Sequence, residues 1–283
     1  MIYECHGHII LDGETYAGAI ARHENGVYEA FIRKNLKICA DHGIVFYRDG
    51  GDKHGASVFA RKIAAEYGID YRTPAYIIHK KQHYGGMFGR SFESISEYRS
   101  LVAEAKLLGA DFIKTTASGM LDFEGGGDVT HPAMAANELS EIINIAHGEG
   151  FSVMVHANGS DSIKCAAESG ADSIEHGFYM DSEALRVISQ TGAVWVPTNV
   201  AVANLIGNSR YDDDVLIRIV NGQKSMLTIA AANGVLIACG SDAGAVSVLQ
   251  GTGTLDERAV LNSLGIDTDP GDRKIEEVFK RKC

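Results

Sequence analysis

Short apolar segments alternate with longer stretches of mixed polar and apolar residues along the whole chain. Eight of these segments are rich in β-branched residues and have the length of buried strands. They span residues 2–8, 43–48, 71–79, 111–116, 151–156, 172–176, 193–198 and 235–241. Because strands that alternate with helices form parallel sheets, this order predicts the α/β class.

The stretches between the strands predict helices. In residues 94–108 apolar side chains recur every three or four positions, which places them on one helical face. Residues 134–148 predict a second helix, and Thr130 followed by Pro132 predicts how it begins. Several helices are expected to end in a glycine directly before the next strand. These glycines are Gly43, Gly68, Gly109, Gly150, Gly170, Gly192 and Gly234.

The number of strand–helix units favours one α/β architecture over another. Eight units in 283 residues match a (β/α)8 TIM barrel in count and size, and a doubly wound sheet is the alternative. No low-complexity stretch or linker interrupts the sequence, so we expect a single domain over residues 1–283. The glycine-rich segments 85–89 and 125–127 follow the third and fourth predicted strands, and we expect both to be mobile loops.

Charge and cysteine content narrow the classes of partner. The chain has 26 Lys and Arg against 37 Asp and Glu, a formal net charge of −11, which argues against nucleic-acid binding through a basic face. No apolar run approaches the roughly 18–20 residues of a membrane span, and residues 1–6 do not resemble a secretory signal. Five scattered cysteines indicate reduced thiols. We therefore expect a cytoplasmic protein with a small-molecule substrate, and a homo-oligomer stays open.

Polar residues stand at the carboxyl ends of five predicted strands, where a barrel carries its catalytic groups. The candidates are His6 and His8 on the first strand, Lys114 on the fourth, His156 on the fifth, His176 on the sixth and Asp242 after the eighth. His6 and His8 are two residues apart, so both side chains face the same side and can bind one ion. A histidine-rich cluster with a carboxylate suits Zn²⁺ or a similar divalent ion.

Each candidate has an ordinary structural explanation when it is taken alone. A strand histidine is more often part of the core, and Asp242 could simply form a turn with the residues that follow. Lys114 is harder to explain, because it stands between Phe-Ile and Thr-Thr, where burying an unpaired charge is costly. The joint pattern of six residues on five strand ends is what predicts a metal site.

In these residues the chain resembles the metal-dependent amidohydrolase superfamily. The resemblance is to the imidazolonepropionase-like branch, which includes prolidase- and carboxypeptidase-like enzymes. The matching segments are His6-Gly7-His8, Ile113-Lys114, Ala117-Ser118-Gly119, Val155-His156-Ala157, Ile174-Glu175-His176-Gly177, Val196-Pro197-Thr198 and Gly240-Ser241-Asp242-Ala243-Gly244. They follow in order over almost the whole chain, and the ordered set is more specific than any one segment.

The resemblance implies that six side chains bind two divalent ions, with zinc as the expected metal. They are His6, His8 and Asp242 for the first ion, His156 and His176 for the second, and Lys114 between them as a carbamate formed with CO₂. A desolvated lysine loses its proton more readily, which favours that carbamate. Asp242 would also be the catalytic general base and acid.

The reaction implied is hydrolysis of a C–N bond in a small amide, peptide or cyclic amide, such as a dipeptide or an N-acyl amino acid. Candidate substrate contacts lie in the loops after the third and fourth strands. They are His79, His83, Tyr84 and His131. Arg48 and Asp49, at the end of the second strand, predict an internal ion pair.

The sequence departs from the family in two places. Family members usually carry flanking segments that build a small β-sandwich, whereas this chain reaches its first predicted strand almost at Met1, so we expect a barrel without that domain. Glu4 stands two residues before the first histidine, where an aspartate is commoner, which leaves the role of that position open.

Other functions fit the same barrel, because a fold does not fix the chemistry. A metal-dependent lyase or isomerase would use a mononuclear site and Lys114 as a free amine. A mononuclear deaminase is another alternative, although Lys114 argues against it. A catalytically inactive metal-binding relic is the last. Metal stoichiometry and a screen of amide substrates distinguish these functions.

Overall fold

The computed structural model describes residues 1–124 and 128–280. The glycine loop predicted at 125–127 lies outside these ranges. Parallel strands form two sheets, as the sequence predicts for the α/β class. One sheet has the order β1 (Ile2–Gly7), β2 (Ile44–Asp49) and β3 (Asp70–Arg72). The other has the order β11 (Val194–Val196), β10 (Ser173–His176), β9 (Val153–Ala157), β6 (Ile113–Thr116), β4 (Ile77–Lys80) and β5 (Gly89–Phe92).

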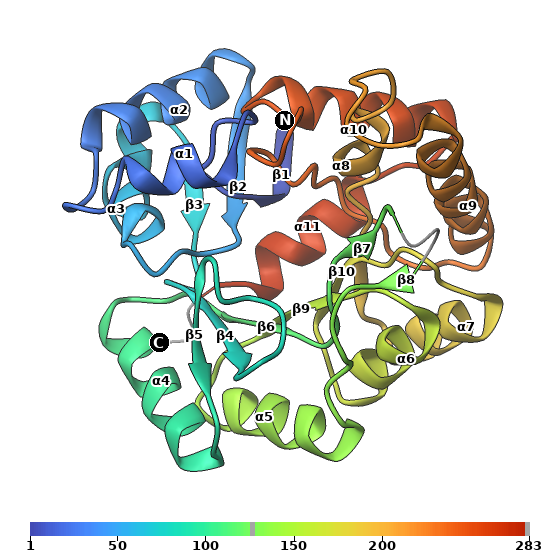
Figure 1. Cartoon of the computed structure of the whole chain (residues 1–283), viewed down its shortest axis with the longest axis horizontal. Helices are drawn as coiled ribbons and strands as arrows, with labels where there is room; N and C mark the ends of the chain where they lie inside the picture. Colours follow the sequence, from blue (N-terminus) through green and yellow to red (C-terminus); the bar gives the residue numbers. More distant parts are fainter. Residues whose placement is uncertain (125–127, 281–283) are drawn as a thin grey trace.

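Helices surround the strands (Figure 1). The first half of the chain contains α1 (Tyr16–Ala21), α2 (Glu29–Asp41), α3 (Ala56–Ile63), a 3-10 helix at Ala64–Tyr67, α4 (Ile95–Leu107) and α5 (Ala136–Gly148). The second half contains α6 (Ser160–Glu168), α7 (Ser182–Thr191), α8 (Val200–Ala203), α9 (Asp213–Ala232), α10 (Thr252–Ser263) and α11 (Asp269–Val278). None of the helices in the described residues combines the length and apolar character needed to cross a bilayer.

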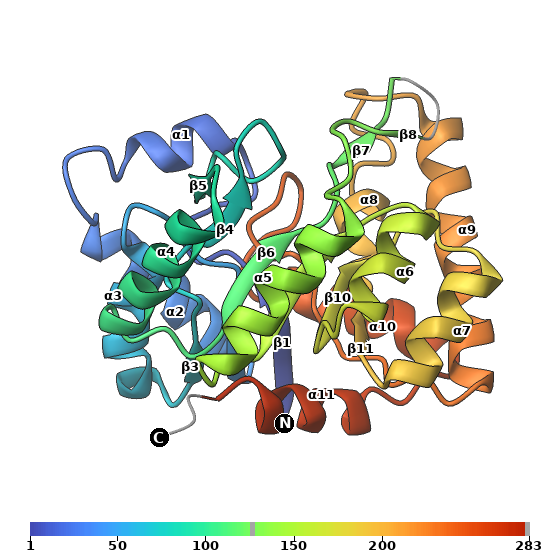
Figure 2. The ribbon, with the colours of Figure 1, turned by 90° about the horizontal axis from the view of Figure 1, so that it is seen from below.

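Helix α11 lies across the end of the molecule at which β1 begins (Figure 2). Its residue Ile275 packs in a buried cluster with Tyr3 of β1, Phe46 of β2, Phe112 directly before β6, and Met154 of β9. The antiparallel hairpin of β7 (Leu121–Asp122) and β8 (Asp128–Val129) lies at the opposite end (Figure 2). The amino ends of the strands are therefore filled with apolar side chains, and polar residues gather at their carboxyl ends.

The predicted strand 71–79 is divided in two, which differs from the sequence expectation. Its first part, β3, pairs with β2, and its second part, β4, pairs with β6. Pro74 lacks a backbone N–H, and Ala75 has a left-handed φ of 67°, so the residues between the two strands interrupt the ladder. The two halves of one predicted strand consequently belong to different sheets.

Residues 235–241 do not form the regular eighth strand that the sequence predicts. A single bridge joins Ile237 to Trp195 of β11, and the carbonyl of Cys239 accepts from Cys5 of β1 at 2.8 Å. The N–H of Cys239 donates instead to the Asp272 carboxylate of α11 at 2.7 Å, which takes it out of any ladder. The segment nevertheless hydrogen-bonds to the edge strand of each sheet.

Both helices that were predicted from apolar spacing are confirmed by α4 and α5. Ser94 caps α4 in a capping box with Glu97. The expected start of the second helix is wrong, because α5 has Ala135 as its N-cap, without a side-chain cap, and Thr130 hydrogen-bonds to His131. All seven predicted helix-ending glycines have positive φ angles, between 72° and 95°.

Candidate metal centre

Three predicted ligands from opposite ends of the chain meet beyond the carboxyl end of β1. Asp242 Oδ1 lies 3.7 Å from His6 Nε2 and 3.6 Å from His8 Nε2. One ligand atom from each residue fits within a group less than 4.8 Å across. Two imidazoles and a carboxylate at this spacing are a donor set that a divalent ion of the zinc type can use.

The other three predicted ligands lie directly beside this group. Lys114 Nζ is 3.1 Å from His6 Nε2. The ring centroid of His176 is 4.8 Å from that of His6 and 4.5 Å from that of His156. The structure therefore brings all six side chains to one place.

Hydrogen bonds to the far side of each ring orient two of the histidines. His6 Nδ1 donates to Glu175 Oε2 at 2.6 Å, which leaves Nε2 facing Lys114 and Asp242. His156 Nε2 donates to the Gly119 carbonyl at 2.9 Å, which leaves its Nδ1 as the free nitrogen. Such contacts fix both the tautomer and the ring orientation of a metal-binding histidine.

The predicted Arg48–Asp49 ion pair is wrong. Arg48 binds both oxygens of Glu175 at 2.9 Å, whereas Asp49 accepts from Tyr71 and from the backbone of Ile9. Neighbouring residues on a strand point to opposite sides, so Arg48 and Asp49 face different surroundings. Glu175, which contacts a candidate ligand, is not among the site residues predicted from the sequence, although a carboxylate directly before His176 in an apolar strand is a usable signal.

Glu4 connects β1 to the segment that carries Asp242. Its carboxylate accepts from the backbone N–H of His6 at 3.0 Å and from that of Ser241 at 2.9 Å. It also accepts from the hydroxyls of Ser241 and Thr254. Glu4, the position at which the sequence departs from the family pattern, thus fixes the backbone of His6 and of Ser241, the residue before Asp242.

The backbone around the site has an unusual conformation. His176, Thr198 and Asp242 have positive φ angles of 68°, 50° and 61°. Non-glycine residues adopt this region rarely and at a cost, and such residues cluster at functional sites.

The space beside the site also requires a glycine at position 50, because a Cβ at Gly50 would lie 2.2 Å from His8 Cε1 and 2.8 Å from Lys114 Nζ.

Burial disfavours the charged form of each site residue, so it favours neutral imidazoles and a neutral Lys114 amine but opposes the ionisation of Asp242. Desolvation lowers the pKa of Lys114 to about 8 and that of His156 to about 3. It raises the pKa of Asp242 to about 6, and the charge on Lys114 opposes that rise. Neutral imidazoles and an ionised carboxylate are the forms that ligate a divalent ion, so the residues fit such a group.

A cavity of about 280 Å³ opens onto these residues. His8, Lys114, His156, His176 and Asp242 line one part of it, and most of the remaining lining is apolar. Of the predicted substrate contacts, Tyr84 lines the cavity, with its ring centroid 4.7 Å from that of His156.

The three predicted loop histidines are not among the described residues that line this cavity. His79 is buried, hydrogen-bonds to the Lys80 carbonyl and packs against Gly85 and Gly89. His131 lies beside Tyr84, with ring centroids 6.1 Å apart. His83 is half-buried in the same loop region.

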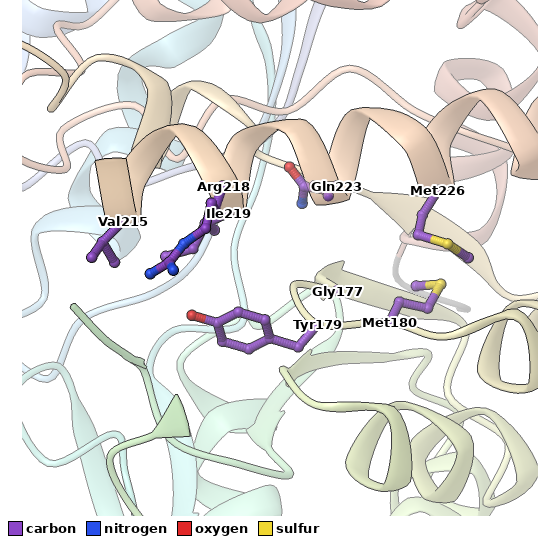
Figure 3. Close-up of a pocket in the computed structure, with 9 residues that line it drawn as sticks. Gly177, Tyr179, Met180, Val215, Arg218, Ile219, Gln223 and Met226 are labelled. Atoms are coloured by element: carbon purple, nitrogen blue, oxygen red, sulfur yellow. The ribbon is translucent and has the colours of Figure 1, made fainter. Parts of the chain in front are cut away.

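A second cavity, of about 540 Å³, lies between α9 and the residues that follow β10 (Figure 3). Arg218, Gln223 and Met226 of α9 face Tyr179 and Met180 across it (Figure 3). Gly177 also borders it, so the two cavities lie on either side of the chain at residues 176–177. None of the six predicted metal ligands is among the residues described as lining the second cavity.

Comparison with known proteins gives one family for most of the chain. The sequence model of the amidohydrolase family matches residues 20–264. Uncharacterized proteins of Mycobacterium bovis and Mycobacterium tuberculosis are 26% identical over 201 residues, which cover 69% of this chain and 53% of theirs. The chain thus spans about half the length of the curated relatives it matches.

Solved structures share the fold at lower identity. A Xaa-Pro dipeptidase with bound methionine aligns with a TM-score of 0.76 and 22% identity, covering 98% of this chain and 72% of its own. The ochratoxinase of A. niger aligns with a TM-score of 0.74 and 19% identity, covering 98% and 69%. Molinate hydrolase aligns with a TM-score of 0.72 and 16% identity, covering 97% and 70%.

Proposed function

The chain belongs to the amidohydrolase family, and we propose that it is a binuclear metal-dependent hydrolase that cleaves a C–N bond of a small amide, peptide or cyclic amide. The observation that carries this proposal is the convergence of six donor side chains at the carboxyl ends of the strands. Six donors exceed the four positions of one tetrahedral site, which favours two ions.

In this proposal His6, His8 and Asp242 hold the first ion, and His156 and His176 hold the second, with zinc as the metal. Lys114 joins the two sites as a carbamate. Its buried amine adds CO₂ in the neutral form and releases a proton, which converts a buried cation into an anionic oxygen ligand. When bound, a pair of divalent ions supplies Lewis acidity that activates water at neutral pH and polarises a carbonyl oxygen.

The protein's own residues position the substrate and move the proton. Asp242 accepts a proton from the attacking water and passes it to the leaving nitrogen, which then departs as a neutral amine. Glu175 and Arg48 hold the ring of His6 in place, and Tyr84 covers His156 on the substrate side. The apolar wall of the cavity excludes bulk water from the reacting groups.

We also infer that residues 1–283 form one hydrolase domain in which the two sheets belong to one barrel. Support comes from two segments that touch both sheets: residues 70–80, which pair with β2 and with β6, and residues 237–239, which bond to β11 and to β1. Barrel closure would explain why six residues from distant strands reach one point.

A substrate screen tests the proposed function. Protein loaded with zinc and bicarbonate is incubated with dipeptides and N-acyl amino acids, and the released amine is measured. We expect hydrolysis that is removed by a chelator, restored by zinc, and at least about 100-fold slower per bound metal in Asp242→Asn protein. Hydrolysis that survives complete metal removal would contradict the proposal, as would turnover of only non-amide substrates by lyase or deaminase chemistry.

A further inference from the structure

The walls of the 280 Å³ cavity contain one charged side chain that the proposed metal chemistry does not use. Arg210 lines the cavity from the loop between α8 and α9. Its guanidinium carbon lies 5.3 Å from the ring centroid of Tyr211, and its backbone N–H donates to Asn208 Oδ1 at 2.9 Å. Tyr211 in turn packs against Phe123, with ring centroids 4.6 Å apart. The guanidinium therefore rests on an aromatic support at the cavity wall.

The nearest acidic residues in the sequence are engaged elsewhere. Asp212 caps α9 by accepting from the N–H of Asp214 at 2.8 Å, and Asp213 accepts from the N–H of Gly207 at 2.8 Å. The interactions of Arg210 with other described residues include no ion pair. Its side chain is exposed, and its charge is available to a ligand.

Arg210 and five of the six candidate metal ligands line the same cavity. The hydroxyl of Tyr16, which also lines the cavity, lies within electrostatic reach of both charges: Asp242 raises the pKa of Tyr16 and Arg210 lowers it, after the larger effect of burial. Since Asp242 and Arg210 line one cavity, a substrate bound at the candidate metal ligands can also reach Arg210.

The other side chains that line the cavity disfavour a positively charged group on the substrate. Among the described residues that line the cavity, Asp242 is the one carboxylate, and it is assigned to the metal. Most other lining side chains are aromatic or aliphatic, as Phe88, Phe178 and Leu205 illustrate. A free α-ammonium group would be desolvated there without an anionic partner, which is costly. A carboxylate, by contrast, can form a bidentate pair with Arg210.

We propose that the substrate is an N-acyl amino acid with an apolar acyl group, and that Arg210 binds its free carboxylate. This inference rests on the proposed function and narrows it. It favours an acylated amino acid over a dipeptide, because the amide-linked acyl group brings no positive charge into the cavity. Arg210 is then a specificity-determining residue that contacts the substrate away from the bond that breaks.

Three matched substrates test this inference with the zinc-loaded protein. They are N-benzoyl-L-leucine, its carboxamide N-benzoyl-L-leucinamide, and the dipeptide L-phenylalanyl-L-leucine. We expect the carboxylate to exceed the carboxamide in kcat/KM by about 10–100-fold, as a charge-assisted hydrogen-bonded pair allows. The dipeptide should be hydrolysed more slowly than N-benzoyl-L-leucine.

Arg210→Met should reduce kcat/KM for N-benzoyl-L-leucine by the same factor, mainly through KM, and leave the carboxamide unchanged. The kcat/KM of Arg210→Lys for N-benzoyl-L-leucine should lie between those of wild-type and Arg210→Met protein, since lysine keeps the charge without the planar guanidinium. Arg218→Met, an exposed arginine of the second cavity, is the matched control and should change neither substrate. Unchanged metal content in each variant verifies that the site is intact.

Equal losses on the carboxylate and the carboxamide, or no loss, would overturn the role of Arg210, and faster hydrolysis of the dipeptide would overturn the preference for an acylated substrate. If wild-type protein hydrolyses no amide, the proposed function fails separately. Calorimetric binding of N-benzoyl-L-leucine to wild-type and Arg210→Met protein then still tests the carboxylate site. Equal affinities in that measurement would refute it.

Discussion

The two cavities on either side of residues 176 and 177 differ in the chemistry of the side chains that line them. The larger, of about 540 Å³, is lined by Arg218, Gln223 and two methionines, and none of the six candidate metal ligands is among its described lining residues. The smaller, of about 280 Å³, receives the candidate metal ligands together with an apolar wall. Convergent titratable side chains, rather than the volume of a cavity, therefore indicate where a reaction takes place.

The ring and the backbone carbonyl of His176 lie on the sides of the two different cavities. His176 lines the smaller cavity, and its Nδ1 pairs with the buried hydroxyl of Thr198 at 2.8 Å. Its carbonyl points away and accepts from Trp195 Nε1 at 3.0 Å and from Gln223 Nε2 at 2.8 Å. Gln223 lines the larger cavity, so that cavity borders the support of the ligand rather than the ligand. Substitutions on the two sides should consequently differ in kind.

The largest effect is expected at Asp242 and His6. Asp242→Asn keeps the shape and one oxygen donor but does not carry a proton, so kcat should fall by roughly 10²–10⁴-fold while metal content falls modestly. His6→Asn should lose metal and activity together, because its imidazole has only the role of a ligand. Steady-state kinetics and elemental analysis on the same samples separate the two outcomes. Wild-type turnover by metallated Asp242→Asn would require another base, and His131 would be the next residue to replace.

A smaller but still large effect is expected from Gly50→Ala. The added methyl group would lie 2.2 Å from His8 Cε1, and such overpacking typically costs about 1–3 kcal/mol. We expect weaker zinc binding, measured by competition with a chelator, without loss of the fold as judged by circular dichroism. Unaltered zinc affinity in a folded Gly50→Ala protein would mean that His8 and Lys114 are not fixed as the structure has them.

The smallest effect is expected in the larger cavity. Arg218→Met replaces an exposed cation, and surface substitutions of this kind change free energies by about 0.5 kcal/mol or less. Because about 0.5 kcal/mol corresponds to roughly a factor of two, its kcat/KM on an N-acyl amino acid should stay within about twofold of the wild-type value. A tenfold loss at unchanged metal content would show that the larger cavity takes part in the reaction after all.

The sequence predicted the parts of the molecule that depend on local pattern. The helices of residues 95–107 and 136–148 follow from apolar spacing, and the positions of His6, His156 and His176 follow from their place at strand ends. Each of these features is predicted from a stretch of neighbouring residues, so one sequence is enough to predict it.

The rest depends on contacts between distant segments. The pairing of Arg48 with Glu175 joins residues 127 positions apart, and no local pattern announces it. The alternation of a strand was nevertheless enough to argue against pairing Arg48 with its neighbour Asp49. Pro74 likewise carried a usable signal for the break in the third strand. The approach of Arg210 to the cavity, in contrast, arises only when the loop after α8 packs against Phe123.

The proposed binuclear site is tested most directly by the metal content of the purified protein and of its Lys114→Ala variant. After loading with zinc and bicarbonate, elemental analysis should give close to two ions per wild-type chain, because six donors exceed one tetrahedral site. Lys114→Ala should lower both this number and turnover, and short-chain carboxylic acids should restore part of the activity, whereas Lys114→Arg should not respond to them. A stable wild-type value near one, unresponsive to added zinc and bicarbonate, would contradict the binuclear site.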